Sequence, residues 1–407
     1  MKEFFQVLDI DAVLGLRERF ESVAVERVDL DMALGRVLAE DITAPADIPG
    51  FDRATMDGFA VRAASTYGAS EGTPAYLEVV GSVTMGQAPE FVVGPGQAAR
   101  IATGGMLPPG ADSVVMVEHA DNLGANTIEV HHSVAPGQFM VARNEDASQG
   151  QRVLSRGTRV RPQEIGLLAA VGCCQVPVFR HPRVGIISTG DEVVASGTTP
   201  EPGQIRDINS HSLAALVRQN GGNPTAYGII GDRYEALFDA FTHALQENDM
   251  VLVSGGSSVG MRDLTLDALQ SLTDSRILCH GVSIRPGKPT ILAQCGTKAF
   301  WGLPGHVASA MVVFLVLVRP LLHYIGGTAP VHPVPLRARL SRNLASVQGR
   351  VDFVRVRLVT REDQLWAEPI LGQSGLIHTM VAADGLVAVG KNSEGLDQGT
   401  WVDVALM

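Results

Sequence analysis

Two short apolar runs near the middle of the chain each lead into a turn of small and polar residues. The run 184–188 (VGIIS) precedes Thr-Gly-Asp-Glu, and the run 250–254 (MVLVS) precedes Gly-Gly-Ser-Ser-Val-Gly. Apolar runs of this length, rich in valine and isoleucine, are typical of buried parallel strands. Ligands bind beyond the carboxyl ends of such strands, so we expect both turns to line one site. Either turn alone is also compatible with an ordinary connection between a strand and a helix.

Strand and helix patterns alternate around these runs, from residue 184 to about residue 324. Such alternation predicts a mainly parallel sheet with helices on both faces, the doubly wound arrangement of α/β proteins. The other expected strands lie at 225–230 and near Ile284, Ile291 and Trp301, and the expected helices span 210–220 (with Asn209 as a candidate N-cap), 234–247 and 264–272.

The pattern changes on both sides of this region. Residues 3–40 predict two helices, and residues 153–171 predict another helix with Pro162 in its first turn. Residues 76–132 form short strand patterns broken by glycine and proline, and strand patterns return after residue 330. The fold class we expect is therefore α/β plus β in several domains.

Composition narrows the possible classes of protein. The length of 407 residues predicts about two to four domains. Hydrophobic residues make up 45% and charged residues 18%, which suits folded domains with full cores. The net charge of -11, with no basic block, argues against a general nucleic-acid binder. If the substrate is an anion, local arginine and lysine side chains must overcome this acidic background.

Other sequence signals predict a soluble, cytoplasmic protein without a membrane partner. Acidic residues interrupt the first eleven positions too early for a signal peptide, and the longest apolar run, 310–318, is too short to cross a bilayer. No pair of cysteines has the C-x-x-C spacing of a zinc site, so free thiols in a reducing compartment are expected for Cys173, Cys174, Cys279 and Cys295.

Several Gly-rich and polar motifs occur in a specific order along nearly the whole chain. They are DIPGFDRATMDGFA (47–60), TGGMLPPGADSVVMVE (103–118), ISTGDE (187–192), GQIRDINSHSL (203–213), SGGSSVGMRD (254–263), RPGKP (285–289) and GLPG (302–305). In this order the motifs resemble the molybdopterin molybdenumtransferase family, which inserts molybdate into molybdopterin and includes the C-terminal domain of gephyrin.

The resemblance implies a division into domains and an assembly. It implies a discontinuous N-terminal helical domain over 1–46 and 141–180, and a β domain inserted over 47–140. A molybdopterin-binding α/β domain would span 181–325, and a C-terminal β domain 326–407. The family also implies a homodimer with its site near the subunit interface.

The resemblance also implies a reaction. The substrate would be an adenylated pterin dithiolene together with molybdate, and Mg²⁺ would be required. The enzyme would hydrolyse the pyrophosphate, release AMP and place molybdenum on the dithiolene sulfurs. It can also contact the molybdopterin adenylyltransferase that delivers the pterin, and molybdoenzyme chaperones. The sequence does not decide between molybdate and tungstate.

Carboxylates in the motifs fit a magnesium site, because Mg²⁺ is usually held by one or two carboxylates plus substrate phosphates. The metal candidates are Asp191, Glu192 and Asp263, although Asp263 can also be read as a helix cap. The candidate catalytic residues that the resemblance implies, with Asp146 and Asp232 in weaker motif matches, are Asp57, Thr103, Asp146, Glu192, Asp232, Asp263, Arg285 and Lys288.

Backbone N–H groups and hydroxyls in the Gly/Ser turn suit phosphate and molybdate, which are tetrahedral oxyanions. Arg285 and Lys288 flank a Pro-Gly turn and can supply positive charge there, although a basic pair is often only a solvated surface. The candidate substrate-binding residues are Arg143, Ser254, Gly255, Gly256, Ser257, Ser258, Pro304, Gly305 and His306.

Two turns depart from the family pattern. The family commonly has GLPGNP where this chain continues GLPG with His306 and Val307, and commonly has R-x-R-G-E-D where residues 141–146 read VARNED. The departures leave open an active enzyme, a divergent copy with another metal or partner, and a non-catalytic pterin-binding scaffold. The motif carboxylates favour the enzyme. A generic nucleotide-binding α/β protein is disfavoured because no G-x-G-x-x-G or Walker A pattern follows an expected strand.

Overall fold

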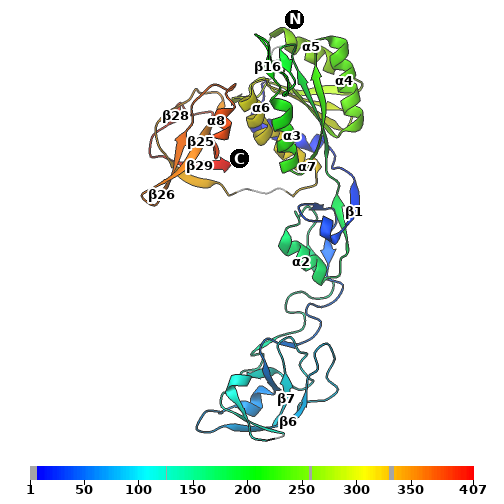
Figure 1. Ribbon diagram of the computed structural model, residues 1–407, viewed down its shortest axis with the longest axis vertical. Helices are drawn as coiled ribbons and strands as arrows, with labels where there is room; N and C mark the ends of the chain where they lie inside the picture. Colours follow the sequence, from blue (N-terminus) through cyan, green and yellow to red (C-terminus); the bar gives the residue numbers. More distant parts are fainter. Residues whose placement is uncertain (1–6, 125, 256–258, 330–333) are drawn as a thin grey trace.

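The computed structural model describes residues 7–124, 126–255, 259–329 and 334–407, and of residues 259–263 the backbone alone. The molecule is elongated (Figure 1). An α/β domain lies at one end with the C-terminal β domain beside it, and the inserted β domain lies at the far end. Between them lies a small unit with the strands β1, β2 and β13 and the helix α2, which we call the N-terminal body. The class α/β plus β, in several domains, is therefore confirmed.

The sheet of the α/β domain has the strand order β17-β14-β18-β22-β21-β19. The pairs β14–β17, β14–β18 and β18–β22 are parallel, whereas β21 and β19 form an antiparallel edge. The apolar runs 184–188 and 250–254 lie in β14 and β18, as expected. The bounds are β14 Arg183–Thr189, β17 Asn223–Ile230, β18 Met250–Ser254, β19 Ser275–His280, β21 Ile291–Cys295 and β22 Lys298–Leu303.

Helices cover both faces of this sheet, which confirms the doubly wound arrangement. Alternate residues of β14 and β18 point to opposite faces, with Ile186 and Leu252 in one core and Ile187 and Val253 in the other. The first core includes α3 (Asn209–Gln219), α6 (Val307–Val313) and α7 (Arg319–Ile325), and the second includes α4 (Tyr234–Glu247) and α5 (Val259–Gln270).

One apolar helical run, Val307–Ile325, is long enough to cross a membrane by length and composition, but 67% of its most apolar window is buried inside the protein. It consists of α6, a π-helical segment η5 (Phe314–Val318) and α7. Pro320 has no N–H, so the hydrogen bond that a regular α-helix would make from residue 320 to the carbonyl of residue 316 is missing in this run. The run is a core helix of the α/β domain, because Phe314, Leu317 and Leu321 are buried against the sheet.

The C-terminal β domain is a closed ring of five strands. Strand β25 pairs with both β26 and β27, and β23 and β29 complete the circle, so the ring leaves no free edge. The expected strands after residue 330 are confirmed. Their bounds are β23 Leu336–Leu340, β25 Val351–Arg361, β26 Gln364–Pro369, β27 Gly385–Val389 and β29 Trp401–Leu406, with the small pair β24 Leu344–Ala345 and β28 Gly395–Leu396, and the helix α8 His378–Val381.

The strand expected near Ile284 in the α/β sheet is wrong. It exists as β20 (Ile284–Arg285), but it pairs in parallel with β25 of the C-terminal domain. Pro286 follows at once and cannot donate a ladder hydrogen bond, so the strand stops after two residues. This misassigned strand brings the RPGKP turn against the C-terminal domain.

The expected pair of helices over residues 3–40 is also wrong in its second half. Residues 10–15 do form α1 (Ile10–Gly15), followed by the 3-10 turn η1 (Leu16–Arg19), but both pack on the α/β core. The remainder forms β1 (Val25–Asp29), η2 (Leu30–Met32) and β2 (Val37–Leu38), which flank β13 (Gln175–Phe179) in the order β1-β13-β2. Met32 and Leu34, whose spacing would suit the apolar face of a helix, are 68% and 60% exposed.

The N-terminal body is therefore a small mixed α/β unit rather than a helical domain. Helix α2 (Pro162–Ala170) is confirmed, with Pro162 in its first turn.

The inserted sheet has the order β8-β5-β7-β6-β10-β9, as expected for a small β domain. Its strands are β5 Gly58–Val61, β6 Ala75–Ser82, β7 Gln97–Ile101, β8 Ser113–Met116, β9 Ala120–Asn122 and β10 Thr127–Val130. Two short pairs lie outside this sheet: β4 Arg53–Ala54 with β11 Met140–Val141, and β3 Ile42–Thr43 with β12 Arg152–Leu154. The domain boundaries given above stay a prediction.

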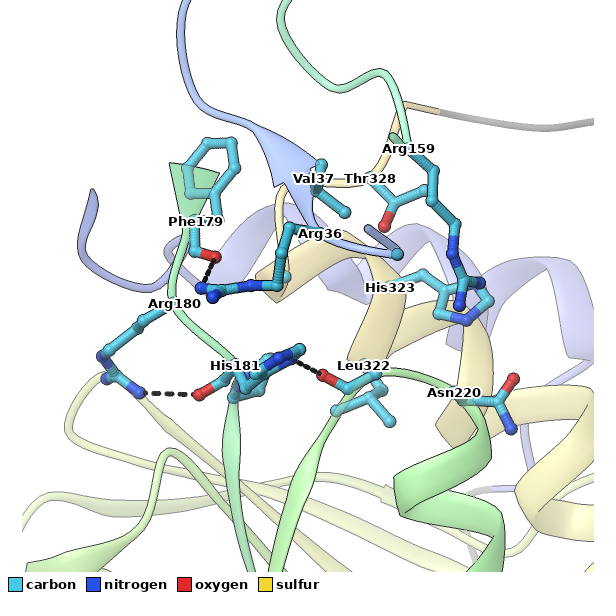
Figure 2. A pocket seen from close by; sticks show the side chains of 14 residues that line it. Arg36, Val37, Arg159, Phe179, Arg180, His181, Asn220, Leu322, His323 and Thr328 are labelled. Carbon is cyan, nitrogen blue, oxygen red and sulfur yellow. Dashed lines mark hydrogen bonds between the residues drawn. The ribbon is translucent and has the colours of Figure 1, made fainter. Parts of the chain in front are cut away.

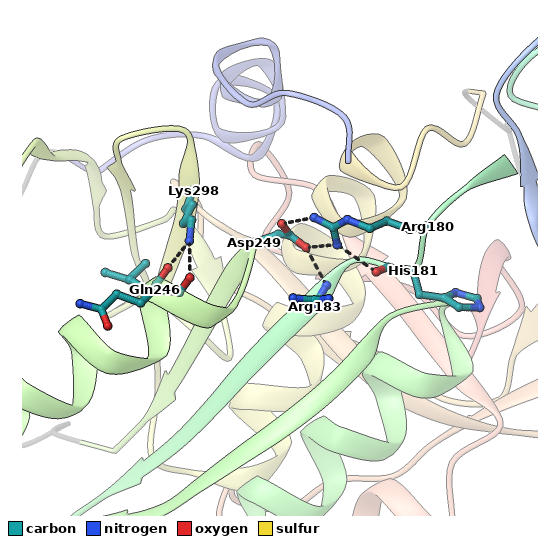
Figure 3. A network of polar contacts seen from close by, with 7 residues as sticks. Arg180, His181, Arg183, Gln246, Asp249 and Lys298 are labelled. Atoms are coloured by element: carbon teal, nitrogen blue, oxygen red, sulfur yellow. Dashed lines mark hydrogen bonds and ion pairs between the residues drawn. The ribbon is translucent and has the colours of Figure 1, made fainter. Parts of the chain in front are cut away.

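An ion pair fixes the connection between the N-terminal body and the α/β domain (Figure 3). Arg180, in the short link between β13 and β14, donates from both terminal nitrogens to the carboxylate of Asp249 at 2.7 and 2.6 Å. The backbone N–H of Arg183 donates to the same carboxylate at 2.8 Å. Burial raises the pKa of Asp249, but these hydrogen bonds outweigh it, so the pKa lies below its ordinary value.

We expect Asp249→Asn to lower the free energy of unfolding at neutral pH by about 2 kcal/mol, because it leaves the half-buried Arg180 without its counter-charge. Since the folded-state pKa of Asp249 is depressed, this stabilisation is present above the unfolded value of about 3.9 and is lost as pH falls through the folded value. Thermal unfolding followed from pH 7 to pH 3 measures both effects.

The matched control is Asp239→Asn, at an exposed position of α4 for which the described part of the chain shows no ion pair. It should change stability by less than about 0.5 kcal/mol. Equal unfolding temperatures for the two variants at neutral pH would show that the Arg180–Asp249 pair does not stabilise the connection.

Candidate active site

A pocket of about 430 Å³ lies at the carboxyl ends of β14 and β18, where the sequence predicted a site. The first turns of α3 and α6 line its other side. We call it the strand-end pocket. It brings together the predicted residues Glu192, Asp232, Ser254, Gly255, Gly305 and His306.

Several side chains of the strand-end pocket have buried polar atoms without a hydrogen-bond partner. Among the residues that the structure describes, these atoms are Thr189 Oγ1, Asn209 Oδ1, Asp232 Oδ1 and Ser254 Oγ. Buried polar atoms in native proteins are nearly always paired, so a group of unpaired atoms around one cavity indicates a polar ligand or bound water. The pocket is thus arranged to receive hydrogen-bonding groups.

Asp191 and Asp232 hold each other through their backbones. The N–H of Asp232 donates to Asp191 Oδ1 at 3.0 Å, and the N–H of Asp191 points to Asp232 Oδ2 at 3.4 Å. Burial raises the pKa of Asp232, and the charges of Asp191 and Glu192 raise it further against the opposing backbone hydrogen bond. Like charges crowded at a pocket are relieved by a cation, so this group suits one.

The turn after β18 depends on a close backbone approach. Gly255 has φ of +128°, and a Cβ at this position would lie 2.3 Å from the carbonyl oxygen of Thr189. Only glycine allows the two strand-end turns to meet in this way. Ser254, directly before it, is 1% exposed. The predicted residues Gly256, Ser257 and Ser258 lie outside the described residues, as does the side chain of Asp263.

Helix α3 is capped by a residue that the sequence analysis did not choose. Asp207 Oδ1 accepts from the N–H of Ser210 at 3.1 Å and from Ser188 Oγ at 3.0 Å. Asn209, the expected cap, is the first helical residue and donates to the carbonyl of Gly305 at 2.8 Å. Asn209 therefore links the first turn of α3 to the GLPG turn, and its side-chain oxygen is buried without a hydrogen-bond partner in the described structure.

A second and larger cavity, about 970 Å³, lies between the α/β domain and the C-terminal β domain. We call it the interdomain cleft. The RPGKP and GLPG turns contribute Arg285, Lys288, Pro304 and His306, and the C-terminal domain contributes Arg350, Asp352, Arg355 and Ser374. The two motif turns thus face residues that no motif had indicated.

The cleft is strongly cationic although the chain carries a net charge of -11. Arg285 and Arg350 share the buried carboxylate of Asp352, at 3.4 and 3.0 Å. Arg355 is 8% exposed and donates to Thr379 Oγ1 at 2.6 Å and to the Gly372 carbonyl at 2.7 Å. Burial lowers the pKa of Arg355, and within the described chain neither Arg355 nor the exposed Lys288 pairs with a carboxylate. Unpaired cations in a cleft attract anions.

His306 lies where the two cavities meet and lines both of them. Its Nδ1 is 2.8 Å from Ser374 Oγ, and the N–H of Ala308 donates to the Ser374 carbonyl at 3.0 Å. His306 is the N-cap of α6, and Val307 occupies the first helical position. A proline at that position contributes no N–H and is dispensable, so the turn keeps its course without the family's Asn-Pro pair.

The predicted residues of the other motifs lie in the inserted β domain and in the loops that join it to the N-terminal body, and Figure 1 shows that domain, with β6 and β7, at the far end of the molecule. Thr103 donates to Asp57 Oδ1 from both N–H and Oγ1, each at 2.7 Å, and this lowers the pKa of Asp57. Arg143 Nε donates to Asp47 at 2.7 Å, and Asp146 is exposed on the same loop. Within one chain these four residues do not reach the strand-end pocket.

The missing motif glycine at position 144 has a structural replacement. Asn144 adopts φ of 60°, in the left-handed region that glycine enters most readily. Asparagine is one of the few other residues that occupy this region with little strain. The loop that carries Arg143 and Asp146 can therefore keep the backbone course of the family pattern.

Sequence reasoning missed Arg355, Arg350, Asn209 and Ser374. Arg355 and Arg350 lie in or beside an alternating strand, where their pattern is that of ordinary polar positions, and only the pairing of β20 with β25 brings them to the cleft. For Asn209 a signal did exist, because it lies within the motif GQIRDINSHSL.

Comparisons with known proteins identify relatives over most of the chain. Three family models match it: the MoeA N-terminal region (domain I and II) at residues 8–172, a probable molybdopterin binding domain at residues 185–324, and the MoeA C-terminal region (domain IV) at residues 337–407. The molybdopterin molybdenumtransferase of Bacillus subtilis is 34% identical over 387 residues, 94% of this chain and 90% of that protein.

Two further relatives agree. The molybdopterin molybdenumtransferase of a Nostoc species is 39% identical over 333 residues, which are 81% of this chain and 76% of that protein. The crystal structure of the molybdopterin biosynthesis protein MoeA from Pyrococcus horikoshii superimposes with a TM-score of 0.85 at 31% identity, covering 99% of this chain and 100% of that one.

We expect Arg355→Gln to weaken molybdate binding in the interdomain cleft about tenfold, which is about 1.4 kcal/mol, because it removes an unpaired buried cation. Stability should change little, since burying that cation without a counter-charge is itself costly. Isothermal calorimetry gives the affinity and thermal unfolding gives the stability. The control Arg357→Gln lies two residues further along β25, where Arg357 pairs with Glu368 at 2.9 Å outside the cleft. Equal affinities in the two variants would remove Arg355 from the anion site.

Proposed function

The chain belongs to the MoeA family of molybdopterin molybdenumtransferases and has a transferase role in molybdenum cofactor biosynthesis, and from this membership we propose the reaction that its cavities perform. It hydrolyses the pyrophosphate of adenylated molybdopterin, releases AMP and transfers molybdenum from molybdate to the dithiolene sulfurs.

The observation that carries this proposal is the meeting of two unlike cavities at His306. The strand-end pocket offers unpaired hydroxyl, amide and carboxylate atoms, which suit the polar groups of a pterin or nucleotide and a bound cation. The interdomain cleft offers Arg285, Lys288 and Arg355, which suit a tetrahedral oxyanion. A substrate lying across His306 would hold its phosphates in the strand-end pocket and its dithiolene next to the interdomain cleft.

Magnesium fits the carboxylates of the strand-end pocket only if the substrate supplies further ligands. In the described chain no group of three or more His, Cys, Asp or Glu side chains converges on one metal position. Mg²⁺ rarely uses a complete protein cage and commonly takes one or two carboxylates plus phosphate oxygens. Asp191, Glu192 and, from its motif, Asp263 would hold the ion, and Asp232 Oδ1 is a buried unpaired oxygen beside them. When bound, the ion would neutralise charge on the pyrophosphate.

The side chains of the chain itself contribute positioning and charge. The side chain of Arg285 is 60% exposed and contacts the buried Asp352 at 3.4 Å, so its guanidinium lies at the cleft beside a single counter-charge. Lys288 and Arg355 would attract molybdate into the interdomain cleft, and their charge would stabilise the bound oxyanion during the transfer. Asn209 and Ser254 would orient the polar edge of the substrate.

A homodimer would complete this site. Asp57 and Thr103, which are hydrogen-bonded to each other, line neither cavity within one chain, and neither do Arg143 and Asp146. In a two-fold assembly the inserted domain of one copy can reach the cavities of the other. Adenylated molybdopterin would be delivered in the cytoplasm by the molybdopterin adenylyltransferase, and the product passed to molybdoenzyme chaperones.

The decisive test follows AMP release by the purified chain with adenylated molybdopterin, molybdate and Mg²⁺. We expect release that requires the metal, and we expect Asp191→Asn to lower kcat by about 100-fold or more, since it removes a metal ligand worth several kcal/mol. Asp267→Asn, at a surface position of α5 on the same domain, serves as the matched control and should stay near wild type. AMP release without added metal, at an unchanged rate, would contradict the magnesium role.

The His306 departure gives a second test of the enzyme against a scaffold. Because His306 and Val307 keep the helix start, we expect the wild type to be active and His306→Asn to change turnover by less than about tenfold, or 1.4 kcal/mol. Ser374→Ala, which removes the partner of His306, should lower kcat/KM in a way that is not additive with His306→Asn. A wild type that is inactive until both His306→Asn and Val307→Pro are made would favour the scaffold.

A further inference from the structure

A third cavity lies away from the proposed catalytic site, at the junction between the N-terminal body and the α/β domain (Figure 2). Its lining comes from both sides of this junction and from the link between them. Arg36 and Arg159 belong to the N-terminal body, Arg180 and His181 to the link between β13 and β14, and His323 to α7. We call it the hinge cavity.

From these residues we propose that the hinge cavity is a binding site for a small tetrahedral oxyanion, with inorganic phosphate or sulfate as the simplest ligand. The residues that line it include arginines and histidines, and no aspartate or glutamate among the described residues lines it. In a chain with a net charge of -11, such a one-sided lining is not expected by chance. The positive charge of the arginines that line the hinge cavity favours an anionic ligand.

The guanidinium of Arg36 provides an independent sign of a missing partner. Arg36 is 9% exposed, and its Nη2 contacts Glu26 Oε1 and donates to the Phe179 carbonyl at 2.9 Å. Its Nε is fully buried and has no hydrogen-bond partner in the described structure. An unpaired buried donor on a charged side chain is costly, and a bound anion or water would satisfy it.

The charge of Arg159 is also unbalanced. Arg180 is paired with Asp249 and Arg36 with Glu26, both outside the lining of the hinge cavity. Arg159 is exposed at the cavity, and no carboxylate of the described chain pairs with it. Figure 2 shows its guanidinium directed toward the His323 ring. Burial, with the charges of Arg319 and Arg159, lowers the pKa of His323 to about 4, so near neutral pH the ring is uncharged and can donate one N–H.

The size of the cavity matches the ligand. Its volume is about 40 Å³. This is more than the roughly 10–15 Å³ that one water needs, so the cavity has room for a small ligand such as one phosphate or sulfate ion. A phosphate group of a larger molecule could enter only from the open side.

Occupation of the cavity would join the bodies on either side of the link. An anion would accept hydrogen bonds from Arg36 and Arg159 of the N-terminal body and from His323 of α7 at the same time. It would act next to the Arg180–Asp249 pair, which already fixes the link (Figure 3). The site would therefore restrict the angle at which the inserted domain, with Asp57 and Thr103, is presented to a second copy of the chain.

The test uses the full-length chain, with sodium phosphate, sodium sulfate or AMP compared with sodium chloride at equal ionic strength. Calorimetry should show phosphate binding that Arg159→Ala weakens at least tenfold and Arg159→Lys weakens less. Arg159 is exposed and its side chain makes no ion pair within the described structure, so this variant is expected to fold. The control is Arg276→Ala, at an exposed position of β19 far from the hinge cavity, and it should leave the affinity unchanged.

A second readout locates the site. Hydrogen exchange of residues 35–38 and 179–183 should slow with phosphate in the wild type and not in Arg159→Ala. If AMP binds with the same dependence on Arg159, the source of the group is a nucleotide phosphate; if only the free anions bind, it is inorganic. The proposal is overturned if phosphate does not bind, or if its binding is lost in Lys288→Ala and kept in Arg159→Ala. That last result would place the anion in the interdomain cleft and would leave the proposed reaction standing.

Discussion

Burial of β14 and β18 on both faces is the constraint on which the site of the α/β domain depends. Every residue of β18 is buried, as are six of the seven residues of β14, so neither strand can shift by one position without moving apolar side chains to the wrong core. The register Ser188↔Ser254 follows, and it sets the two strand-end turns against each other at Gly255. The polar atoms of the strand-end pocket are held in place by apolar packing behind them.

Rigid packing of the two domains also explains how an acidic protein can have a cationic cleft. The cations of the interdomain cleft come from turns that the α/β core positions and from a strand that a closed ring positions. Arg355 is fixed by Thr379 and the Gly372 carbonyl rather than by a carboxylate, so its charge stays unneutralised while its geometry is defined. Bonds to neutral acceptors orient a cation without cancelling its field. The repulsion of the remaining surface falls off over roughly 8 Å at physiological salt, whereas the nearby cations act at contact distance.

Sequence patterns were sufficient for elements whose period reflects their own burial. The strands β14 and β18 and the helix α4 were predicted almost to the residue because one or both faces are apolar. Sequence patterns failed where a strand forms only by pairing with a distant part of the chain. Residues 25–38 form strands only because β13, about 140 residues later, lies between them, and β20 belongs to the C-terminal sheet because β25 accepts it.

The candidate site shows the same division. Turn residues such as Gly255 and His306 could be selected from motifs, because the backbone course of a turn constrains its residues locally. Arg355 and Ser374 could not, because their role arises only when two domains pack. The hinge cavity combines residues separated by almost 300 positions, and none of its arginines stands out in the sequence.

The position of β13 has a consequence for synthesis on the ribosome. In the order β1-β13-β2 the central strand is translated last, after the whole inserted β domain, whose six strands lie between residues 58 and 130. The inserted sheet can therefore form while β1 and β2 still lack the strand that joins them. Domains commonly fold as units while later residues are being added. During synthesis the inserted β domain can thus be folded while the N-terminal body is still incomplete. The sheet β1-β13-β2 forms only when residues 175–179 have left the ribosome.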